Sequence, residues 1–143
     1  MLCVQVQYRG QRAWAKVFND HIEPSTQLAK QELSAYQTLH DCAAIPRLLA
    51  HGVLQGTPYS TLVLQDCGEE LVLVEGRVPQ HLRDAVQAAI QSLHEAGWVH
   101  GDLHPRNMVQ CEGVIKIVNL EDSRIGDDRA RRTELRRFAG SFW

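Results

Sequence analysis

The stretch His100–Val109, HGDLHPRNMV, is the most informative part of this chain of 143 residues. An aspartate is followed five residues later by an asparagine, in a segment that lies between a helical pattern and an apolar run. The carboxylate of Asp102 can accept a proton from an attacking hydroxyl, and the amide oxygen of Asn107 can hold a metal ion that is bound to phosphates. The stretch therefore predicts a loop suited to phosphoryl transfer.

The composition is that of an ordinary globular protein, with 44% hydrophobic and 22% charged residues. No apolar run approaches the ~20 residues that a membrane span needs, and no basic segment followed by an apolar stretch opens the chain. We therefore expect a cytoplasmic protein with no membrane partner. The net charge of −2 gives no general attraction to nucleic acid, which we do not expect as a partner either.

The cysteines and the C-terminal arginines are both given a structural interpretation. The four cysteines lie far apart with no C-x-x-C pair, which fits reduced thiols and not a zinc knuckle or a disulfide framework. The arginines between 124 and 137 alternate with acidic residues. Such alternation favours a solvated helix face over a site for polyanions.

The hydrophobic patterns predict strands, a helix, strands, and then a helix, a loop, a hairpin and a last helix. The first half of the chain contains a hairpin, a helix and a strand: Cys3–Phe18 with its turn at Tyr8–Gln11, Pro24 to about His40, and Tyr59–Gln65. In the second half we expect a short extended piece, a helix, two strands around Glu112-Gly113 and a final helix: Leu71–Val74, Pro79–Ala96, Met108–Cys111 with Val114–Val118, and Asp127–Phe138.

This order of elements, with H-G-D-x-H-x-x-N after the long helix, resembles the protein-kinase-like fold. The loop is most similar to those of aminoglycoside and choline phosphotransferases and of small fungal kinase-like proteins. The resemblance covers roughly residues 4–138 and is most specific over 94–122. It implies an α+β, compact two-lobed fold, in which a small antiparallel N-terminal sheet with one helix precedes a reduced helical C-terminal lobe. The expected single domain, 1–143, divides into an N-lobe (1–65), a hinge (66–70) and a C-lobe (71–143).

The resemblance assigns Lys16 to the phosphates of ATP and makes Glu32 its partner on the first helix. One face of that helix carries Glu32 in an apolar stripe with Leu28, Ala35 and Leu39. A buried charge needs a partner, and Lys16 is the natural one. The alternative is that Glu32 is solvated and that the inward face consists of Ala29, Leu33, Tyr36 and His40.

The remaining roles also follow from the resemblance. Asp66 and Gly68 would offer backbone groups to the adenine of ATP, Asp102 would be the catalytic base, and Asn107 and Asn119 would hold Mg²⁺. His100 is interpreted as a structural histidine that braces the loop. A zinc site at His100 and His104 is disfavoured because no third ligand is in view.

Several departures from the family pattern weaken the case for catalysis. Asn119 stands where the family carries its main metal-binding aspartate, and a neutral amide binds Mg²⁺ less well than a carboxylate does. Glu121 or Asp122 could substitute for that carboxylate. His104 replaces a lysine that contacts phosphate, and the chain has no G-x-G pair. The 24 residues after Asn119 are too few for the segments of a full protein kinase, which suggests a truncated member.

These departures favour a kinase-like nucleotide-binding protein with impaired or lost phosphotransfer, that is, a pseudokinase-like binding module. The alternative is an active, compact ATP-dependent phosphotransferase, a protein or small-molecule kinase that uses Asp102 as its base. A different transfer, such as adenylylation, is a third option that no residue specifically favours. An apolar patch left by the short C-terminus would suit a protein partner or self-association.

Overall fold

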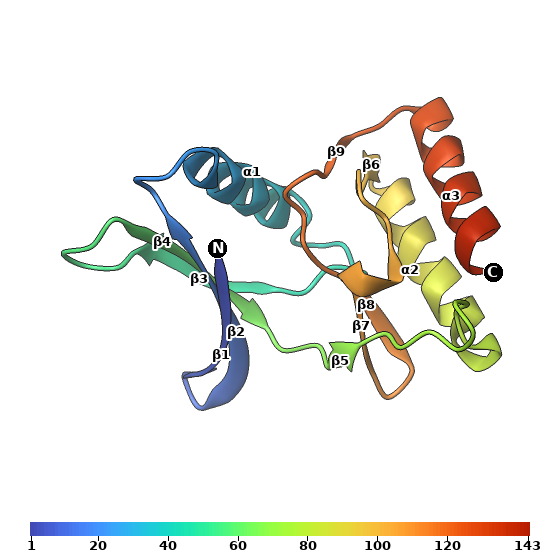
Figure 1. Ribbon diagram of the computed structural model, residues 1–143, viewed down its shortest axis with the longest axis horizontal. Helices are drawn as coiled ribbons and strands as arrows, with labels where there is room; N and C mark the ends of the chain where they lie inside the picture. The colour runs from blue at the N-terminus through green and yellow to red at the C-terminus, as the bar shows by residue number, and fades with distance from the viewer.

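A four-stranded antiparallel sheet forms the first part of the computed structural model, which describes residues 1–143. The strands lie in the order β1-β2-β4-β3 (Figure 1). Their bounds are β1 Leu2–Tyr8, β2 Gln11–Asn19, β3 Leu48–Val53 and β4 Tyr59–Gln65. Arg9 and Gly10, with φ of 49° and 80°, make the tight turn between β1 and β2. The predicted hairpin and the predicted strand Tyr59–Gln65 are therefore present.

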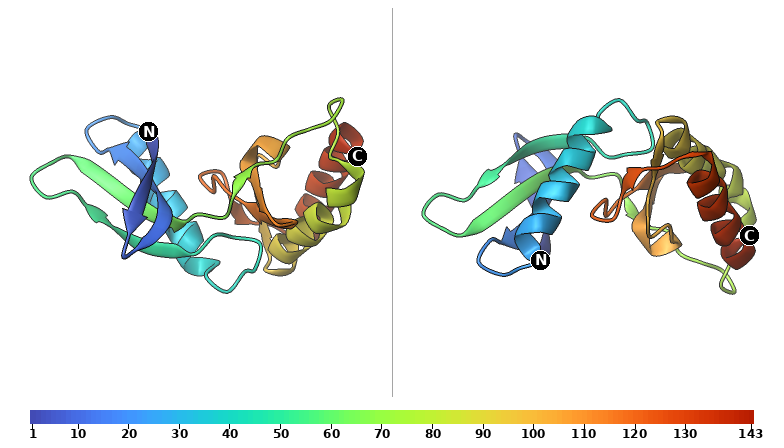
Figure 2. Two further views of the ribbon diagram at one scale, coloured as in Figure 1. Left: turned by 90° about the horizontal axis from the view of Figure 1, so that it is seen from below. Right: turned by 90° about the horizontal axis from the view of Figure 1, so that it is seen from above.

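Helix α1, Ser25–Thr38, packs against β2 and β4 of this sheet (Figures 1 and 2). Its buried residues include Ala29, Ala35 and Tyr36, together with one charge, Glu32. The helix thus buries a carboxylate between itself and the sheet. This placement brings Glu32 to the neighbourhood of Lys16 on β2.

The rest of the chain forms two further small sheets and two long helices. Strands β5, β7 and β8 pair in that order, and β6 pairs with β9. The bounds are β5 Glu69–Glu70, α2 Arg83–Glu95, β6 Trp98–Val99, β7 Met108–Cys111, β8 Val114–Ile117, β9 Arg124–Ile125 and α3 Asp128–Phe142. A 3₁₀ turn at Gln80–Leu82 precedes α2. Figure 2 shows α2 and α3 side by side, on the far side of the β7–β8 hairpin from the larger sheet.

One hydrophobic cluster of 21 buried residues joins the two sets of elements. From the first part it takes Phe18, Tyr36 and Leu62, and from the second part it takes the apolar face of α2 and residues of β7 and β8. Phe138 of α3 is also in this cluster. Helix α3 is thereby fixed against the core by its apolar face, while its other side faces solvent.

The predicted α+β class is confirmed, and the differences from the expected elements are local. Strand β3 was not predicted, β5 lies at Glu69–Glu70 and not at 71–74, and α3 runs on to Phe142. The short strands β6 and β9 were also missed. The kinase-like two-lobed arrangement and the division at 66–70 stay predictions. None of the helices is both long and apolar enough to span a membrane.

Candidate functional site

Two cavities meet at the loop that follows β6. The first, which we call the large cleft, has a volume of about 1070 Å³ and is lined by residues that include Lys16, Asp66, Gly68, Arg106 and Asn119. The second, which we call the arginine cavity, has a volume of about 520 Å³. Its lining includes Gly101, Asp102, Arg124, Arg129, Thr133, Glu134 and Arg137. Asp102 and Arg106 are bonded to each other and line different cavities, so the loop separates the two spaces.

The buried end of the large cleft is organised around Lys16. Its Nζ donates to both carboxylate oxygens of Glu32, at 2.6 and 2.8 Å, and to Oδ1 of Asn119 at 3.2 Å. The backbone N–H of Leu120 also donates to Glu32 Oε1, at 3.3 Å. Burial raises the pKa of Glu32, and the charge of Lys16 offsets part of that rise. The predicted Lys16–Glu32 pair is present, and the alternative of a solvated Glu32 is wrong.

Glu121 adds a second carboxylate to this group. Its Oε2 atom lies 3.8 Å from Nζ of Lys16. The same atom is shielded from solvent and accepts no hydrogen bond. Two carboxylates therefore face a single ammonium group, and one buried oxygen lacks a partner. Such an oxygen is costly unless a cation or a donor satisfies it.

Asn119 and Asn107 connect Lys16 to the Asp102 loop. Nδ2 of Asn119 donates to Oδ1 of Asn107 at 2.7 Å. Nδ2 of Asn107 in turn donates to the backbone oxygen of Asp102 at 2.8 Å and to its Oδ2 at 3.2 Å. Asn119 has a φ of 61°, a left-handed conformation that asparagine and aspartate tolerate better than most residues. The structure thus brings the predicted residues of positions 16, 32, 102, 107 and 119 into one hydrogen-bonded group.

His100 and Gly101 fix the backbone of the loop. His100 is fully buried; its Nε2 donates to the carbonyl of Val118 at 2.8 Å, and its Nδ1 accepts from the N–H of Asp102 at 3.2 Å. Gly101 has a φ of 85°, and a Cβ atom there would lie 2.4 Å from the backbone oxygen of Asp122. His100 therefore has the contacts of a structural histidine, and only glycine fits at position 101.

Arg106 holds the carboxylate of Asp102. Its Nη2 lies 2.9 Å from both oxygens. Burial acts to raise the pKa of Asp102. Hydrogen bonds from Arg106 and Asn107 and the charge of Arg106 outweigh burial, so the pKa of Asp102 lies below its ordinary value. The sequence indicated that a positive charge was missing at His104. Arg106 supplies one two residues later, and its position within the loop motif could have suggested this.

Glu134 of α3 is a second residue that the sequence did not single out. Its Oε1 accepts from the N–H of Gly101 at 2.8 Å, and its Oε2 accepts from the N–H of His100 at 3.1 Å. His94 of α2 lies 2.7 Å from the same Oε2. Burial acts to raise the pKa of Glu134. These hydrogen bonds outweigh burial, so the pKa of Glu134 lies below its ordinary value. Glu134 thus ties the loop to α3, a contact that no local pattern indicates.

Asp66 and Gly68 line the large cleft together with Asn119. Oδ1 of Asp66 accepts from the N–H of Gly68 at 3.1 Å, and its Oδ2 lies 3.3 Å from Nε of Arg12. Gly68 has a φ of 108°, and a Cβ atom there would overlap the backbone oxygen of Gln110. The backbone N–H groups of Asp66 and Cys67 donate to no other group of the protein. They are free to bind a ligand in the cleft.

No group of three or more His, Cys, Asp or Glu side chains is arranged to hold a metal ion. The oxygen atoms near the loop come instead from two amides and one carboxylate, those of Asn107, Asn119 and Glu121. Hard oxygen donors of this kind suit Mg²⁺ when phosphates supply further ligands. Oε2 of Glu121, which has no hydrogen-bond partner and lies 3.8 Å from Nζ of Lys16, is the feature that fits a further cation best.

A protein-family model described as lipopolysaccharide core biosynthesis protein (WaaY) matches residues 66–141. The matched segment contains the Asp102 loop, Asn119 and all but the last residue of α3, while Lys16 and Glu32 lie outside it. No curated protein matches the chain. The expected assignment to aminoglycoside or choline phosphotransferases, or to truncated fungal kinase-like proteins, was wrong, because the matching family is a different one.

Proposed function

The chain belongs to the family of lipopolysaccharide core biosynthesis proteins (WaaY), and on that premise we propose that it transfers the γ-phosphate of ATP to a hydroxyl of the lipopolysaccharide core. The observation that carries the proposal is the continuous line of contacts Lys16–Asn119–Asn107–Asp102. This line connects a cleft large enough for a nucleotide with the cavity that Asp102 lines. The activity belongs to the transferases, with an acceptor that is a sugar and not a protein.

ATP would lie in the large cleft. The free backbone N–H groups of Asp66 and Cys67 would bind the adenine edge, and Gly68 lets the chain pass close to β7 at that point. Lys16, fixed by Glu32, would contact the phosphates at the buried end. A fixed ammonium group loses little side-chain entropy when the phosphates arrive.

Asp102 would act as the general base. Aspartate is a carboxylate at neutral pH and can accept the proton of the acceptor hydroxyl, while the lowered pKa makes Asp102 a weaker base until Arg106 moves away. The acceptor oxygen then forms a bond to the γ-phosphorus, while the bond from that phosphorus to the β–γ bridging oxygen breaks and ADP leaves with the electron pair. Arg106, which is bonded to Asp102, would shift toward the transferring phosphate and stabilise its charge.

Asn107, Asn119 and Glu121 would hold Mg²⁺, which, when bound, neutralises charge on the β- and γ-phosphates. Glu121 replaces the carboxylate that position 119 lacks. Its Oε2 is already in the buried group around Lys16 and has no hydrogen-bond partner. For this reason we propose an active phosphotransferase and not a protein that has lost its activity.

The first experiment measures transfer from γ-labelled ATP to purified lipopolysaccharide, with Mg²⁺ and then Mn²⁺. We expect transfer by the wild type and a loss of about 10²–10⁴-fold in kcat for Asp102→Asn. The matched control is Asp41→Asn, because the side chain of Asp41 is 92% exposed and far from the loop in sequence. If the wild type transfers no phosphate but Asn119→Asp does, the proposal is contradicted, because Asn119 would then have disabled the site.

A second measurement tests the metal ligands without relying on catalysis. Binding of Mn²⁺ in the presence of ATP is followed by electron paramagnetic resonance for the wild type, Glu121→Gln and Asn119→Asp. We expect weaker Mn²⁺ binding for Glu121→Gln and tighter binding for Asn119→Asp, because each change alters the carboxylate count by one. Equal binding by the wild type and Glu121→Gln would remove Glu121 from the site.

A further inference from the structure

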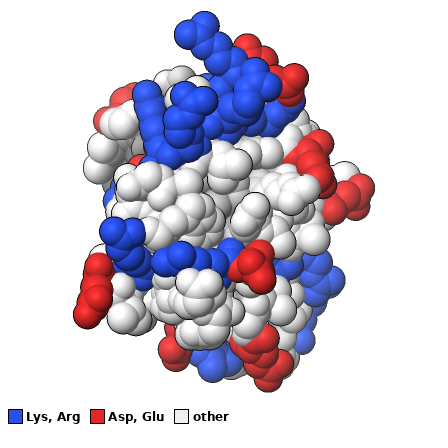
Figure 3. All heavy atoms as spheres, turned by 90° about the vertical axis from the view of Figure 1, so that its right-hand side faces the viewer, with Lys and Arg blue, Asp and Glu red and all other residues white.

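We propose that the arginine cavity binds an anionic substituent, a phosphate or a carboxylate, carried by the acceptor sugar next to the hydroxyl that becomes phosphorylated. This inference rests on the proposed function and names the feature by which the site recognises its acceptor. Figure 3 shows Lys and Arg side chains gathered at one end of the face that carries α3. The arginines that line the cavity are Arg124 of β9 and Arg129 and Arg137 of α3.

The carboxylates of the cavity are already engaged. Asp102 is bonded to Arg106, and Asp127 accepts from the N–H of Ala130 as the N-cap of α3, at 2.8 Å. Glu134 accepts from the backbone of the loop and from His94. Each of the three keeps its negative charge, but none of them forms an ion pair with Arg124, Arg129 or Arg137.

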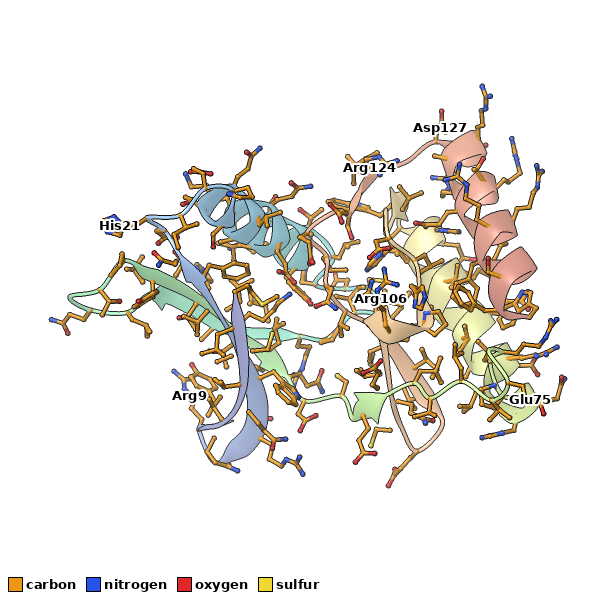
Figure 4. All side chains as sticks on the ribbon, in the orientation of Figure 1. Arg9, His21, Glu75, Arg106, Arg124 and Asp127 are labelled. Carbon is orange, nitrogen blue, oxygen red and sulfur yellow. The ribbon has the colours of Figure 1, made fainter.

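The arginines of the cavity have no such partners. The guanidinium groups of Arg124, Arg129 and Arg137 make no hydrogen bond or ion pair within the protein. Arg131 on the same helix differs, because it bonds to Asp128 and to the carbonyl of Gly126. Figure 4 shows Arg124 near Asp127, at the approach to α3. Three unpaired cations that line one cavity are an arrangement suited to an anion.

The position of Asp102 connects this anion site with the chemistry. Asp102 and Gly101 line the same cavity as the three arginines. An anionic group held by the guanidinium forks would therefore leave a neighbouring hydroxyl of the same sugar near the carboxylate of Asp102. The hydroxyl of Thr133 lines the cavity too and could hydrogen-bond the sugar. The alternating charges of this segment predicted a solvated helix face, and Arg124, Arg129 and Arg137 are indeed exposed; in addition, these three line the cavity.

The test compares arginines of one helix that differ in position. Arg129→Gln and Arg137→Gln remove cavity charges, whereas Arg132→Gln and Arg136→Gln remove exposed charges of α3 outside the cavity. For each cavity variant we expect the KM for lipopolysaccharide core oligosaccharide to rise about ten-fold, with kcat and the KM for ATP unchanged. The control variants should stay within about two-fold of the wild type. Equal KM values in both sets would overturn the inference.

Two modified acceptors identify the anion. One is the core oligosaccharide after removal of its phosphates with hydrofluoric acid, and the other is the same oligosaccharide after reduction of its carboxyl groups. The modified acceptor that binds more weakly than the native one to the wild type, but not to Arg129→Gln, has lost the recognised group and so identifies it. If both modified acceptors bind as well as the native one, no anion is recognised and the inference fails.

Direct binding separates this inference from the proposed function. Calorimetric titration of the native oligosaccharide into the wild type and Arg129→Gln needs no turnover. If no acceptor is phosphorylated, the proposed function fails. A binding difference between the two proteins would still support the arginine cavity, and its absence would overturn it.

Discussion

The group around Lys16 and the arginine cavity lie on opposite sides of the Asp102 loop and handle charge in opposite ways. Lys16 is 3% exposed, donates hydrogen bonds to the carboxylate of Glu32 and the amide of Asn119, and lies 3.8 Å from the carboxylate of Glu121. Arg129 and Arg137 are exposed and have no such partners. A buried charge must find its partner inside the protein, whereas a charge near solvent is stabilised by water until a ligand displaces it. The group around Lys16 is therefore fixed before a ligand binds, whereas the arginine cavity gains its counter-charge only when a ligand binds.

The largest effect on stability is expected at the buried pair. Glu32→Gln would leave Lys16 in a buried site with only the more distant carboxylate of Glu121, 3.8 Å away, as counter-charge, at a cost of about 3 kcal/mol in the free energy of unfolding. Urea denaturation measures this cost. The triple variant Lys16→Met/Glu32→Leu/Glu121→Gln should recover most of it, because all three charges of the group are then gone. A loss below about 1 kcal/mol for Glu32→Gln would mean that the Lys16 group is solvated like the arginines, and the contrast between the regions would disappear.

A comparable effect is expected at Gly101, which lies between the two regions. Its Cβ would stand 2.4 Å from the backbone oxygen of Asp122, and its φ is 85°. We expect Gly101→Ala to lower the free energy of unfolding by at least about 2 kcal/mol. Gly10→Ala is the matched control, because Gly10 has a φ of 80° but open space around its Cβ position. Its cost should stay near 1 kcal/mol, which is roughly the conformational part alone.

A smaller, pH-dependent effect is expected for Glu134, a carboxylate of the arginine cavity that accepts hydrogen bonds from the loop backbone. Glu134→Gln should lower stability at neutral pH by about 2 kcal/mol, since charge-assisted hydrogen bonds to His94 and the loop are lost. The pKa of Glu134 is lowered in the folded protein, so its contribution is present above the ordinary glutamate pKa and is lost as the pH falls through the folded value.

Denaturation curves measured from pH 7 down to about pH 3 would show this dependence. The difference between the wild type and Glu134→Gln should shrink toward acid pH. A difference that stays constant over the range would mean that the charge of Glu134 is irrelevant and that only its shape anchors the loop.

The smallest effect is expected at the rim of the large cleft. Arg12 is 66% exposed and lies 3.3 Å from Asp66. Exposed ion pairs contribute little, so Arg12→Ala should change the free energy of unfolding by less than about 1 kcal/mol. Thermal denaturation at low and high salt is the measurement. A loss as large as that of Glu32→Gln would show that the rim is organised like the buried end of the cleft.

Much of the fold could be predicted because its longer elements have strong periodic signals. The apolar positions of α2 recur at helical spacing, and the turns at Arg9-Gly10 and Glu112-Gly113 mark their hairpins. Strand β3 escaped detection because His51 and Gly52 interrupt any alternation of apolar residues. Strands β6 and β9 have two residues each, too few to form a pattern.

The candidate site likewise contains residues that the sequence indicated and residues that it did not. Asp102 and Asn107 belong to one local motif. Lys16 and Glu32 are paired through the family resemblance, which the place of Glu32 in an apolar stripe supports. Glu134 could not be found, because its contacts to the loop span more than 30 residues of sequence. The sequence also did not indicate which of the arginines line the cavity. Which of them turn toward the cavity depends on how α3 packs through Phe138.

The position of Glu134 on α3 also has a consequence for communication between acceptor and catalytic base. The same helix carries Arg129 and Arg137 and, through Glu134, holds the backbone of His100 and Gly101. An acceptor that reduces the motion of α3 therefore also reduces the motion of the loop. An ordered loop in turn holds the cavity in the shape that binds the acceptor. Thermodynamic linkage makes this influence reciprocal, so each state favours the other by the same free energy.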